Sequence, residues 1–250
     1  MQLGHPHSRL ITRLSATVGL SEQDRNLISG LPMHVRNVPA DHDIVRQGQV
    51  TGQCCLLLDG FLFRYKEGSD GRRQILSFYV PGDIPDLHSM HLGPMDHNLA
   101  SVGAAVVAFI AHSALFEIIA VSPALNHTFM REMIVDASIQ REWRLNIGTR
   151  QALPRAAHLI CEIAARLKAV GLARDLNFSW PVSQADIADA CGISTVHANR
   201  VVQEMRARGL IEWRGRALKI LDWDELASVG DFTTDYLYLN NKSGASIASK

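Results

Sequence analysis

The sequence of 250 residues contains little that would direct the protein out of the cytoplasm. Its four cysteines, Cys54, Cys55, Cys161 and Cys191, form neither a CxxC pair nor a disulfide-like spacing, which fits a reducing compartment. The longest uninterrupted apolar run, Ala104–Ala111, is far too short to cross a bilayer. The N-terminal MQLGHPHSRL has no apolar signal core. We therefore expect a cytoplasmic protein with no membrane partner.

The net charge of the whole chain is zero, but the charges are unevenly distributed along it. The chain carries 25 Lys and Arg against 25 Asp and Glu. Residues 150–220 hold 11 basic and 6 acidic side chains, a balance of +5, whereas residues 1–149 and 221–250 have balances of −2 and −3. A basic block between acidic segments is typical of a modest DNA-binding module. A chance excess on a solvated surface gives the same count, so the charge pattern needs a motif to support it.

The first 121 residues combine helical and β patterns. Leu10, Leu14 and Val18 lie on one helical face, and Ser21–Asp24 resembles a helix-capping box. Short β runs follow, and the candidate strands are 43–46, 54–58, 61–65, 74–80, 101–103 and 106–110. Turn residues separate them at Gly48, Asp59–Gly60, Gly68–Gly71 and Pro81–Asp83. The spacing predicts a small antiparallel barrel or sandwich, and with the helices an α+β chain.

A long helix is predicted after Ser122–Pro123, a serine N-cap followed by proline at the first helical position. It runs to about Ile147, and we expect Gly148 to end it. Its apolar side chains exceed what a thin barrel alone would cover; they are Leu125, Phe129, Met130, Met133, Ile134 and Ala137. We therefore expect residues 122–148 to pack against the same helix of a second copy, so that the chain is its own partner. An ordinary core helix is the alternative.

Residues Gln184–Gln203 (QADIADACGISTVHANRVVQ) match the helix-turn-helix pattern position by position. Ala188 falls where two helices cross closely and only a small side chain fits, and Gly192 falls where the turn favours a left-handed backbone. The positions that hold the two helices together are filled by Ile187, Cys191, Ile193, Ala198 and Val201. We interpret the segment as a DNA-binding motif rather than an unrelated helical hairpin.

The second helix of this motif, from about Thr195 to Arg208, is expected to lie in a major groove of double-stranded DNA. Arg200 can pair with guanine, Asn199 can reach adenine and Val196 can touch a thymine methyl group. The predicted DNA-contacting residues on or beside this helix are Ser194, Thr195, Val196, His197, Asn199, Arg200 and Gln203.

Two further sets of residues are predicted to meet phosphate. Ser183 caps the first helix, as Ser194 caps the second, and Ser183 and Gln184 stand at a helix start whose free N–H groups suit an anion. After Gly209 the run LIEWRGRALKIL predicts a β hairpin with Arg214 and Arg216 at its tip. Such a hairpin is the wing of a winged helix, and its arginines would contact the DNA backbone.

With these parts in this order, the chain resembles the Crp/Fnr superfamily of bacterial transcription factors. The resemblance covers about residues 9–229 and includes VRQGQ, LLLDGFLFRY, DGRRQILSFYVPGDI, the long helix and GISTVHANRVVQEMRARGLIE. It implies a cyclic-nucleotide-binding-like antiparallel β-roll (a double-stranded β-helix or jelly roll), a dimerisation helix and a winged helix on a two-fold symmetric operator. Arg200 matches the family's base-contacting arginine. Many members carry a glutamate where this chain has Val196, so their usual half-site does not transfer.

The resemblance implies two candidate ligands, cyclic AMP and an iron–sulfur cluster, and this sequence lacks the residues that each of them needs. The cyclic AMP branch needs an Arg-Ser pair and a Gly-Glu pair, where this chain has Pro85–Leu87 and His97–Ala100. Without that arginine no obvious group neutralises the cyclic phosphate. The oxygen-sensing branch needs an N-terminal cysteine cluster for an iron–sulfur centre, and no cysteine precedes Cys54. We expect neither cyclic AMP nor an iron–sulfur cluster.

Histidines are concentrated in one part of the expected roll, at positions 88, 91, 97 and 112. Imidazoles beside carboxylates could bind a transition metal, and histidine with methionine could bind haem. The spacing H-x2-H-x5-H matches no established ligand rule, so a solvated or hydrogen-bonded loop is the favoured interpretation and no metal is assigned. If an effector binds the roll, the candidate pocket residues are Asp86, His88, His91, His97 and Asn98.

The sequence as a whole predicts a homodimeric, sequence-specific transcription regulator with no enzymatic activity. We expect a β-roll sensor with N-terminal helices over residues 1–121, the dimerisation helix over 122–148, the winged helix-turn-helix over 149–229, and an acidic to polar tail over 230–250 that is disordered at its end. If the regulator is an activator, RNA polymerase is a further partner. The alternatives are a histidine-rich β-barrel sensor of metal or haem, or a cupin-like metalloenzyme with a helical appendage. No cupin H-x-H pair followed by glutamate is present.

Overall fold

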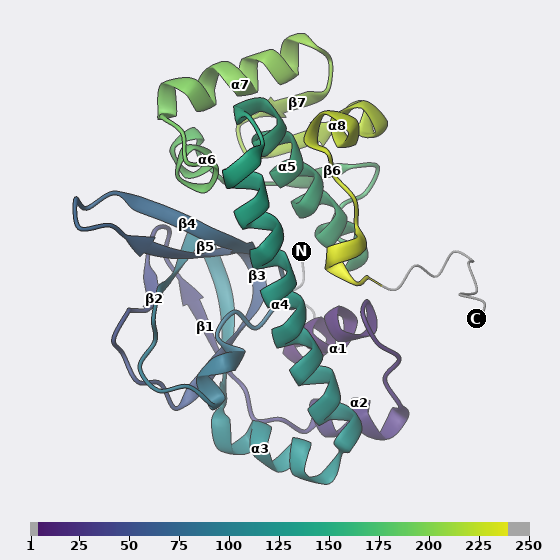
Figure 1. Cartoon of the computed structure of the whole chain (residues 1–250). Coiled ribbons are helices and arrows are strands. Elements are labelled where there is room, and N and C mark those ends of the chain that lie inside the picture. The colour runs from purple at the N-terminus through teal and green to yellow at the C-terminus, as the bar shows by residue number, and fades with distance from the viewer. Residues whose placement is uncertain (1–4, 240–250) are drawn as a thin grey trace.

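A computed structural model describes residues 5–239 as a β-roll, a long helix and a C-terminal helical domain. The chain begins with α1 (Pro6–Ser15) and α2 (Glu22–Ser29), which lie against one end of the roll (Figure 1). Ser21 caps α2 in a reciprocal capping box with Asp24, as its sequence predicts. The expected tail end at residues 240–250 lies outside the described residues.

The roll is built on one antiparallel sheet of five strands. The strands are β1 (His34–Val38), β2 (Asp43–Val45), β3 (Gln53–Glu67), β4 (Arg73–Tyr79) and β5 (Asn98–Ala111). They pair in the order β1-β5-β3-β4, with β2 also paired to β5. Strand β1 was missed because four of its five side chains are exposed and give no alternating pattern.

Asp59–Gly60 does not separate two strands, contrary to the sequence prediction. The strand β3 continues through it, with irregular pairing to β5 on both sides of Asp59. Gly60 has a φ of +85°, and a Cβ atom there would lie 2.8 Å from the carbonyl oxygen of Ala104. A left-handed glycine therefore bends the strand as a bulge without ending it. Similarly, the predicted strands 101–103 and 106–110 form one strand, β5.

Two helices follow the roll. Helix α3 (His112–Val121) starts directly at the end of β5 and was not predicted, because Ala111 at its N-cap makes no side-chain capping bond. Helix α4 (Pro123–Thr149) begins at the predicted Ser122 cap, whose hydroxyl accepts a hydrogen bond from the Leu125 amide. The prediction that Gly148 ends this helix is wrong: Gly148 lies inside α4, and Arg150 is the C-cap.

The C-terminal domain consists of short helices around a three-stranded sheet. Its elements are α5 (Ala152–Ala169), β6 (Asn177–Ser179), α6 (Gln184–Cys191), α7 (Thr195–Ala207), β7 (Ile211–Arg214), β8 (Ala217–Ile220) and α8 (Trp223–Gly230). The strands pair in the order β6-β8-β7. A last turn, η2 (Asp235–Leu237), brings Leu237 into the core of this domain.

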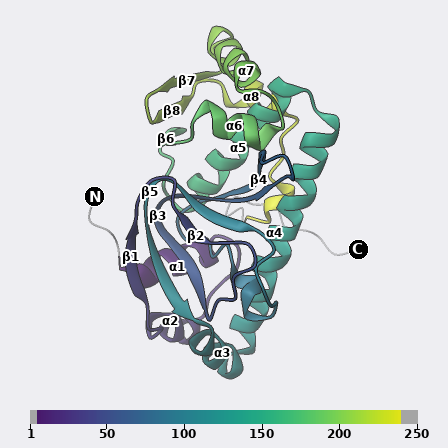
Figure 2. The same cartoon turned by 90° about the vertical axis from the view of Figure 1, so that its left-hand side faces the viewer.

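Helix α4 lies beside both the roll and the C-terminal domain. In Figure 2, where the molecule is turned by 90°, it runs along one edge with no other described element on its outer side. Among residues 5–239, no helix has the length and apolar character needed to cross a membrane. The arrangement is α+β, with an antiparallel roll, a long helix and a helix-turn-helix with a hairpin, as the sequence predicts.

Replacing Gly60 tests the bulge in β3. We expect Gly60→Ala to lower the free energy of unfolding by about 1–3 kcal/mol, because a side chain must take a positive φ against the Ala104 carbonyl. Gly52→Ala is the matched control, since nothing lies within 4 Å of a Cβ there, and it should change stability by less than about 0.5 kcal/mol. Urea unfolding of both variants measures the difference. Equal stability would contradict the bulge geometry.

Candidate DNA interface and sensor cavity

Helices α6 and α7 form the helix-turn-helix, and the turn between them has the predicted backbone. Gly192 has φ 64° and ψ 40°, the left-handed conformation that ends α6 and reorients the chain. Ser183 caps α6 through the Asp186 amide, and Ser194 caps α7 through the His197 amide. The residues expected to hold the pair together, Ile187, Ala188, Cys191, Ala198 and Val201, are all buried, and Ile193 is partly buried against them. The predicted caps and packing positions are thus confirmed.

Helix α7 lies at the top of the molecule in Figure 1. The exposed residues of this helix are mostly polar or charged. The residues that were predicted to contact DNA and are exposed here are Ser194, Thr195, Val196, His197, Asn199, Arg200 and Gln203. Val196 is 64% exposed although it is apolar, and such exposure suits a contact surface. Within residues 5–239, Arg200 has neither a hydrogen bond nor an ion pair, whereas the Asn199 amide donates to Gln184 at 2.7 Å.

The hairpin β7–β8 lies beside α7. Its tip holds Arg214 and Arg216, both exposed, and Gly215 between them has a φ of +57°. Arg214 pairs with Glu212 at 2.8 Å on the surface. The indole rings of Trp180 and Trp213 stack at 5.3 Å beneath the hairpin, so the base of this wing is fixed while its tip is free of the core.

The start of α6 carries both the predicted phosphate-contacting residues and a carboxylate. The Ser183 hydroxyl and amide both donate to Asp186 Oδ2, at 2.7 and 2.9 Å. Asp186 Oδ1 accepts from Arg73 at 2.6 Å, and Arg73 also reaches Asp189 at 2.8 Å. Gln74 donates to the Asp189 carbonyl oxygen. The hairpin β3–β4 of the roll therefore contacts α6, an interdomain contact that no sequence pattern predicted.

A second interdomain contact is a buried ionic network between α1, the roll and α5. Asp83 accepts hydrogen bonds from Arg13 and Arg166, both at 2.7 Å. Burial alone would raise the pKa of Asp83, but the two guanidinium groups hold this pKa below its ordinary value. Arg166 also donates to Glu162, whose side chain is fully buried and which accepts from Trp143 and Tyr236.

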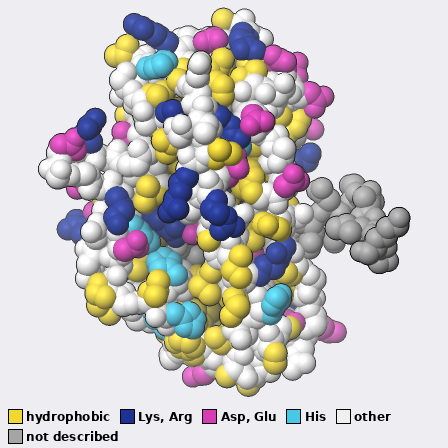
Figure 3. All heavy atoms as spheres, viewed as in Figure 1, with side chains coloured by type: hydrophobic (Ala, Val, Ile, Leu, Met, Phe, Trp, Pro, Cys, Tyr) yellow, Lys and Arg dark blue, Asp and Glu magenta, His cyan; other side chains and the backbone are white. Residues whose placement is uncertain are grey.

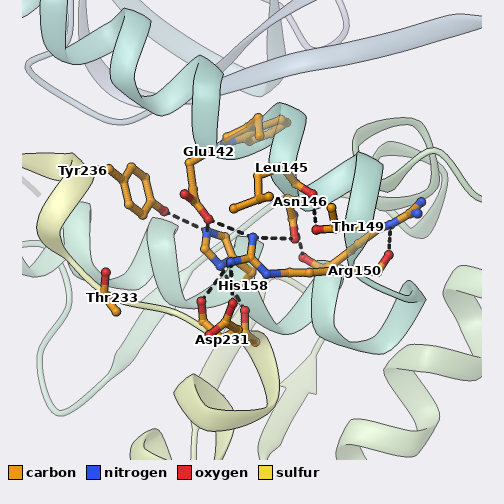
Figure 4. Close-up of polar contacts among 12 residues, drawn as sticks. Glu142, Leu145, Asn146, Thr149, Arg150, His158, Asp231, Thr233 and Tyr236 are labelled. Carbon is orange, nitrogen blue, oxygen red and sulfur yellow. Dashed lines mark hydrogen bonds and ion pairs between the residues drawn. The ribbon is translucent and has the colours of Figure 1, made fainter.

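The network continues to the end of α4 through His158 (Figure 4). His158 Nδ1 lies 3.1 Å from the Gly230 carbonyl oxygen, and Nε2 lies 3.0 Å from the Tyr236 hydroxyl. Burial lowers the pKa of His158. Beside it, Arg150 pairs with Glu142 at 2.8 Å and with Asp231 at 3.0 Å. Residues 231–239 are thereby attached to α4 and α5.

A cavity of about 560 Å³ lies between the roll and α4. Its charged and polar lining comes from both sides: Arg64, Lys66, His88, Asp96 and His97 from the roll, and Glu132, Asp136, Gln140 and Arg144 from α4. Figure 3 shows histidine side chains on the roll side of this face, with Lys and Arg side chains gathered above them. The lining also contains apolar side chains, so the cavity is polar only in part.

Arg64 is the central cation of this cavity and was not singled out from the sequence. It bridges to Asp136 of α4 at 2.9 Å and donates to the Pro85 carbonyl oxygen at 2.6 Å. Arg64 and Lys66 are cations of this cavity that were not expected from the sequence, but both lie beside carboxylates, Asp136 and Asp96. An arginine within the apolar run LFRY was the available signal, because a charge at a strand position between buried neighbours needs a partner.

The five candidate pocket residues are not all brought together. His88 and His97 meet, with ring centroids 5.2 Å apart. His91 instead stacks edge-on against Phe116, and Asn98 accepts a hydrogen bond from the Gln47 amide. Asp86 is fully buried and accepts from the Cys55 amide, and burial raises its pKa to about 7. Asp96, which was outside the predicted set, joins the two histidines.

The environment also perturbs the two histidines that meet. Burial, together with the nearby Arg64 charge, lowers the pKa of His97 to about 4, and the same two causes lower the pKa of His88. Both imidazoles are therefore neutral at pH 7. The pKa of the Cys55 thiol is raised by burial, so this cysteine is an unreactive core residue as its position in a strand suggests.

Comparison with known proteins covers both domains. The family model of the cyclic nucleotide-binding domain matches residues 35–122, and that of the Crp-like helix-turn-helix domain matches residues 154–229. The transcriptional activator protein FnrA of Stutzerimonas stutzeri is 23% identical over 212 residues, which are 85% of this chain and 86% of that protein. The nitrogen fixation regulation protein FixK of Bradyrhizobium diazoefficiens is 28% identical over 166 residues, 66% of this chain and 69% of FixK.

The fold is shared with solved structures of similar size. The structure of FixK2 from Bradyrhizobium japonicum aligns with a TM-score of 0.71 at 21% identity, over 80% of this chain and 98% of that one. These matches confirm the predicted fold class and favour a regulator over a cupin-like metalloenzyme. With both of its domains matched in this order, and with the fold shared along most of its length, the chain belongs to the Crp/Fnr superfamily of transcription regulators.

Proposed function

We propose that this DNA-binding regulator acts as a homodimer, which reads a two-fold symmetric operator through α7 and holds the DNA backbone through the wing. In this proposal residues 1–121 are the sensor, residues 122–148 the dimerisation helix and residues 149–229 the DNA-binding domain. The observation that carries it is the free outward face of α7, fixed by the left-handed turn at Gly192 and bordered by the exposed arginines of the hairpin tip.

The roles on this face follow from what each side chain can reach. Arg200 has five N–H donors and no partner within residues 5–239, so its guanidinium group is available to guanine O6 and N7. Val196 offers an apolar contact to a thymine methyl group. Asn199 must release Gln184 before its amide can pair with adenine. Ser183 and Gln184 would contact phosphate at the start of α6. The Ser183 hydroxyl and amide must first release the Asp186 carboxylate, whose charge Arg73 offsets.

The dimer proposal rests on an apolar stripe along the outer side of α4. Met130 and Ile134 are 49% and 58% exposed, and Leu145 is 46% exposed. Ala137 and Arg141 lie between them at helical spacing and are exposed too. Large apolar side chains aligned on one helix face are costly in water and favour a second helix as cover. Two copies of α4 packed along this stripe would place two α7 helices on one side of the dimer.

The cavity between roll and α4 is the proposed effector site, where ligand binding would be linked to the position of α4. The carboxylates and cations of its lining balance one another, so the lining does not select one charge of ligand.

Contact with RNA polymerase belongs to the proposal only if the regulator activates transcription. Selection of bound DNA from a random pool, with and without candidate effectors, tests the whole scheme. Recovery of no symmetric sequence would overturn it.

Removing Arg200 should reduce base selectivity. We expect Arg200→Ala to cost about 1–3 kcal/mol in discrimination at one base position of the operator, because a bidentate pair with guanine is lost. Competition binding against single-base operator variants measures this. Arg208→Ala is the matched control, since Arg208 is at the far end of α7 and pairs with Glu225. Identical selectivity in the Arg200 variant and the native chain would contradict the assignment.

Removing the wing arginines should act differently. We expect Arg214→Ala and Arg216→Ala to weaken binding to all DNA sequences similarly, and each to reduce the slope of log K against log salt by about 1. Filter binding over a range of salt concentrations gives both quantities. Arg46→Ala, an exposed arginine on the roll that pairs with Asp43, should change neither. A loss confined to one base position would show that these arginines read bases instead.

A charge placed in the α4 stripe should separate the dimer. We expect Ile134→Glu to weaken dimerisation by at least about 2 kcal/mol, about 30-fold in the dissociation constant, because two carboxylates would be buried together. Val50→Glu provides the control, as Val50 is 71% exposed on the roll. Sedimentation equilibrium distinguishes monomer from dimer. A dimer of unchanged stability would place the interface elsewhere.

A further inference from the structure

Three side chains of the roll come together at the cavity wall in an arrangement that suits a metal ion. His88 lies on the short turn η1 (Leu87–Met90), while Asp96 and His97 precede β5. Each offers one ligand atom, and these atoms all lie within 4.8 Å of one another. Ligands of a tetrahedral zinc ion lie about 3.3–3.5 Å apart. The most distant of the three groups would therefore have to close by about 1.3–1.5 Å, which side-chain rotation of the partly exposed His88 and the exposed Asp96 allows.

His97 is the strongest evidence for a ligand at this place. The residue is only 3% exposed, yet its Nε2 atom has no hydrogen-bond partner among the described residues. Its other nitrogen, Nδ1, lies 2.6 Å from Asp96 Oδ1. A carboxylate on one imidazole nitrogen fixes the tautomer that leaves a lone pair on the other. To bind the ion itself, the exposed Asp96 side chain would have to turn away from Nδ1. A buried lone pair without a partner, on a residue that lines the cavity, is costly unless something binds it.

The charges around the three residues allow a cation. Arg64 is close, but its charge is compensated by Asp136 of α4 at 2.9 Å. Lys66 lies 3.9 Å from Asp96 Oδ2 and is half exposed, so it can turn to solvent. The remaining charged group at the site is the Asp96 carboxylate itself.

We propose that His88, Asp96 and His97 bind one divalent first-row transition-metal ion. Two imidazoles and one carboxylate suit zinc, iron(II) or cobalt(II) and do not suit magnesium or calcium, which prefer oxygen ligands. Three protein ligands leave coordination positions open toward the cavity, where water or a small ligand would complete the set. The ion would sit between the roll and α4 beside the Arg64–Asp136 bridge.

Metal titration of the full-length protein tests this directly and needs no DNA. Protein freed of metal with a chelator is titrated at pH 7.5 with cobalt(II), followed by its visible absorption bands, and with zinc in competition with a chromophoric chelator. We expect one equivalent to bind. His5 and His7 form a second imidazole pair, with Nδ1 atoms 2.8 Å apart near the N-terminus. The titrations therefore use a His5→Ala/His7→Ala background, which removes that competing pair.

Variants at the three positions decide the outcome. His88→Gln and His97→Gln should abolish the one-equivalent site, and Asp96→Asn should weaken it by about 10–100-fold. His91→Ala is the matched control and should bind as before, because His91 is close in the chain to His88 but packs against Phe116 of α3. If the buried His97 variant fails to fold by circular dichroism, the His88 variant carries the test. Absence of stoichiometric binding, or binding that survives His88→Gln, would overturn the proposal.

Discussion

The buried pairing of Asp83 with Arg166 is the interaction on which the arrangement of the two domains depends. Asp83 lies four residues beyond the end of β4 in the roll, and Arg166 lies on α5 of the DNA-binding domain. Both side chains are more than nine-tenths buried. A buried charge without its partner is destabilising by several kcal/mol. Arg166 also donates to the Phe78 carbonyl oxygen at 2.8 Å, and Arg13 shares Asp83 from α1. Separating the domains would break the buried Asp83–Arg166 pair and leave Asp83 only Arg13 and Arg166 only Glu162 as ionic partners.

The ion pairs of Arg73 with Asp186 and Asp189 of α6 form a second, weaker contact between the domains. Its guanidinium group is about a quarter exposed and lies over the ring of Phe63 at 4.9 Å. Exposed ion pairs contribute little to stability, so this contact orients the helix-turn-helix more than it stabilises it. The buried network therefore fixes where the DNA-binding domain is attached, and the Arg73 contact fixes how α6 is turned toward the roll.

The helix-turn-helix was predictable because its determinants lie within twenty contiguous residues: a small Ala188, a left-handed Gly192 and two serine caps. The roll was predictable only in outline. The bulge at Gly60 depends on Ala104 across the sheet, and the sequence pattern alone treats the same glycine as a turn. The pairs Arg64–Asp136 and Arg166–Asp83 join residues 72 and 83 positions apart, a separation that no local pattern reports. Likewise, the turn η1 decides that His88 rather than His91 meets His97.

Helix α4 connects all of these features because its inner face contacts each of them in turn. Glu132 pairs with Arg13, Asp136 with Arg64 at the cavity, and Trp143 donates to Glu162 in the buried network. Glu142, the residue before Trp143, pairs with Arg150 at the end of the helix. These contacts are spaced along one continuous helix. A shift of α4 at the cavity must therefore also change the contact of α4 with Glu162 and hence with α5. The cavity and the DNA-binding domain are therefore mechanically connected through this helix, even though no cavity residue lies on α6 or α7.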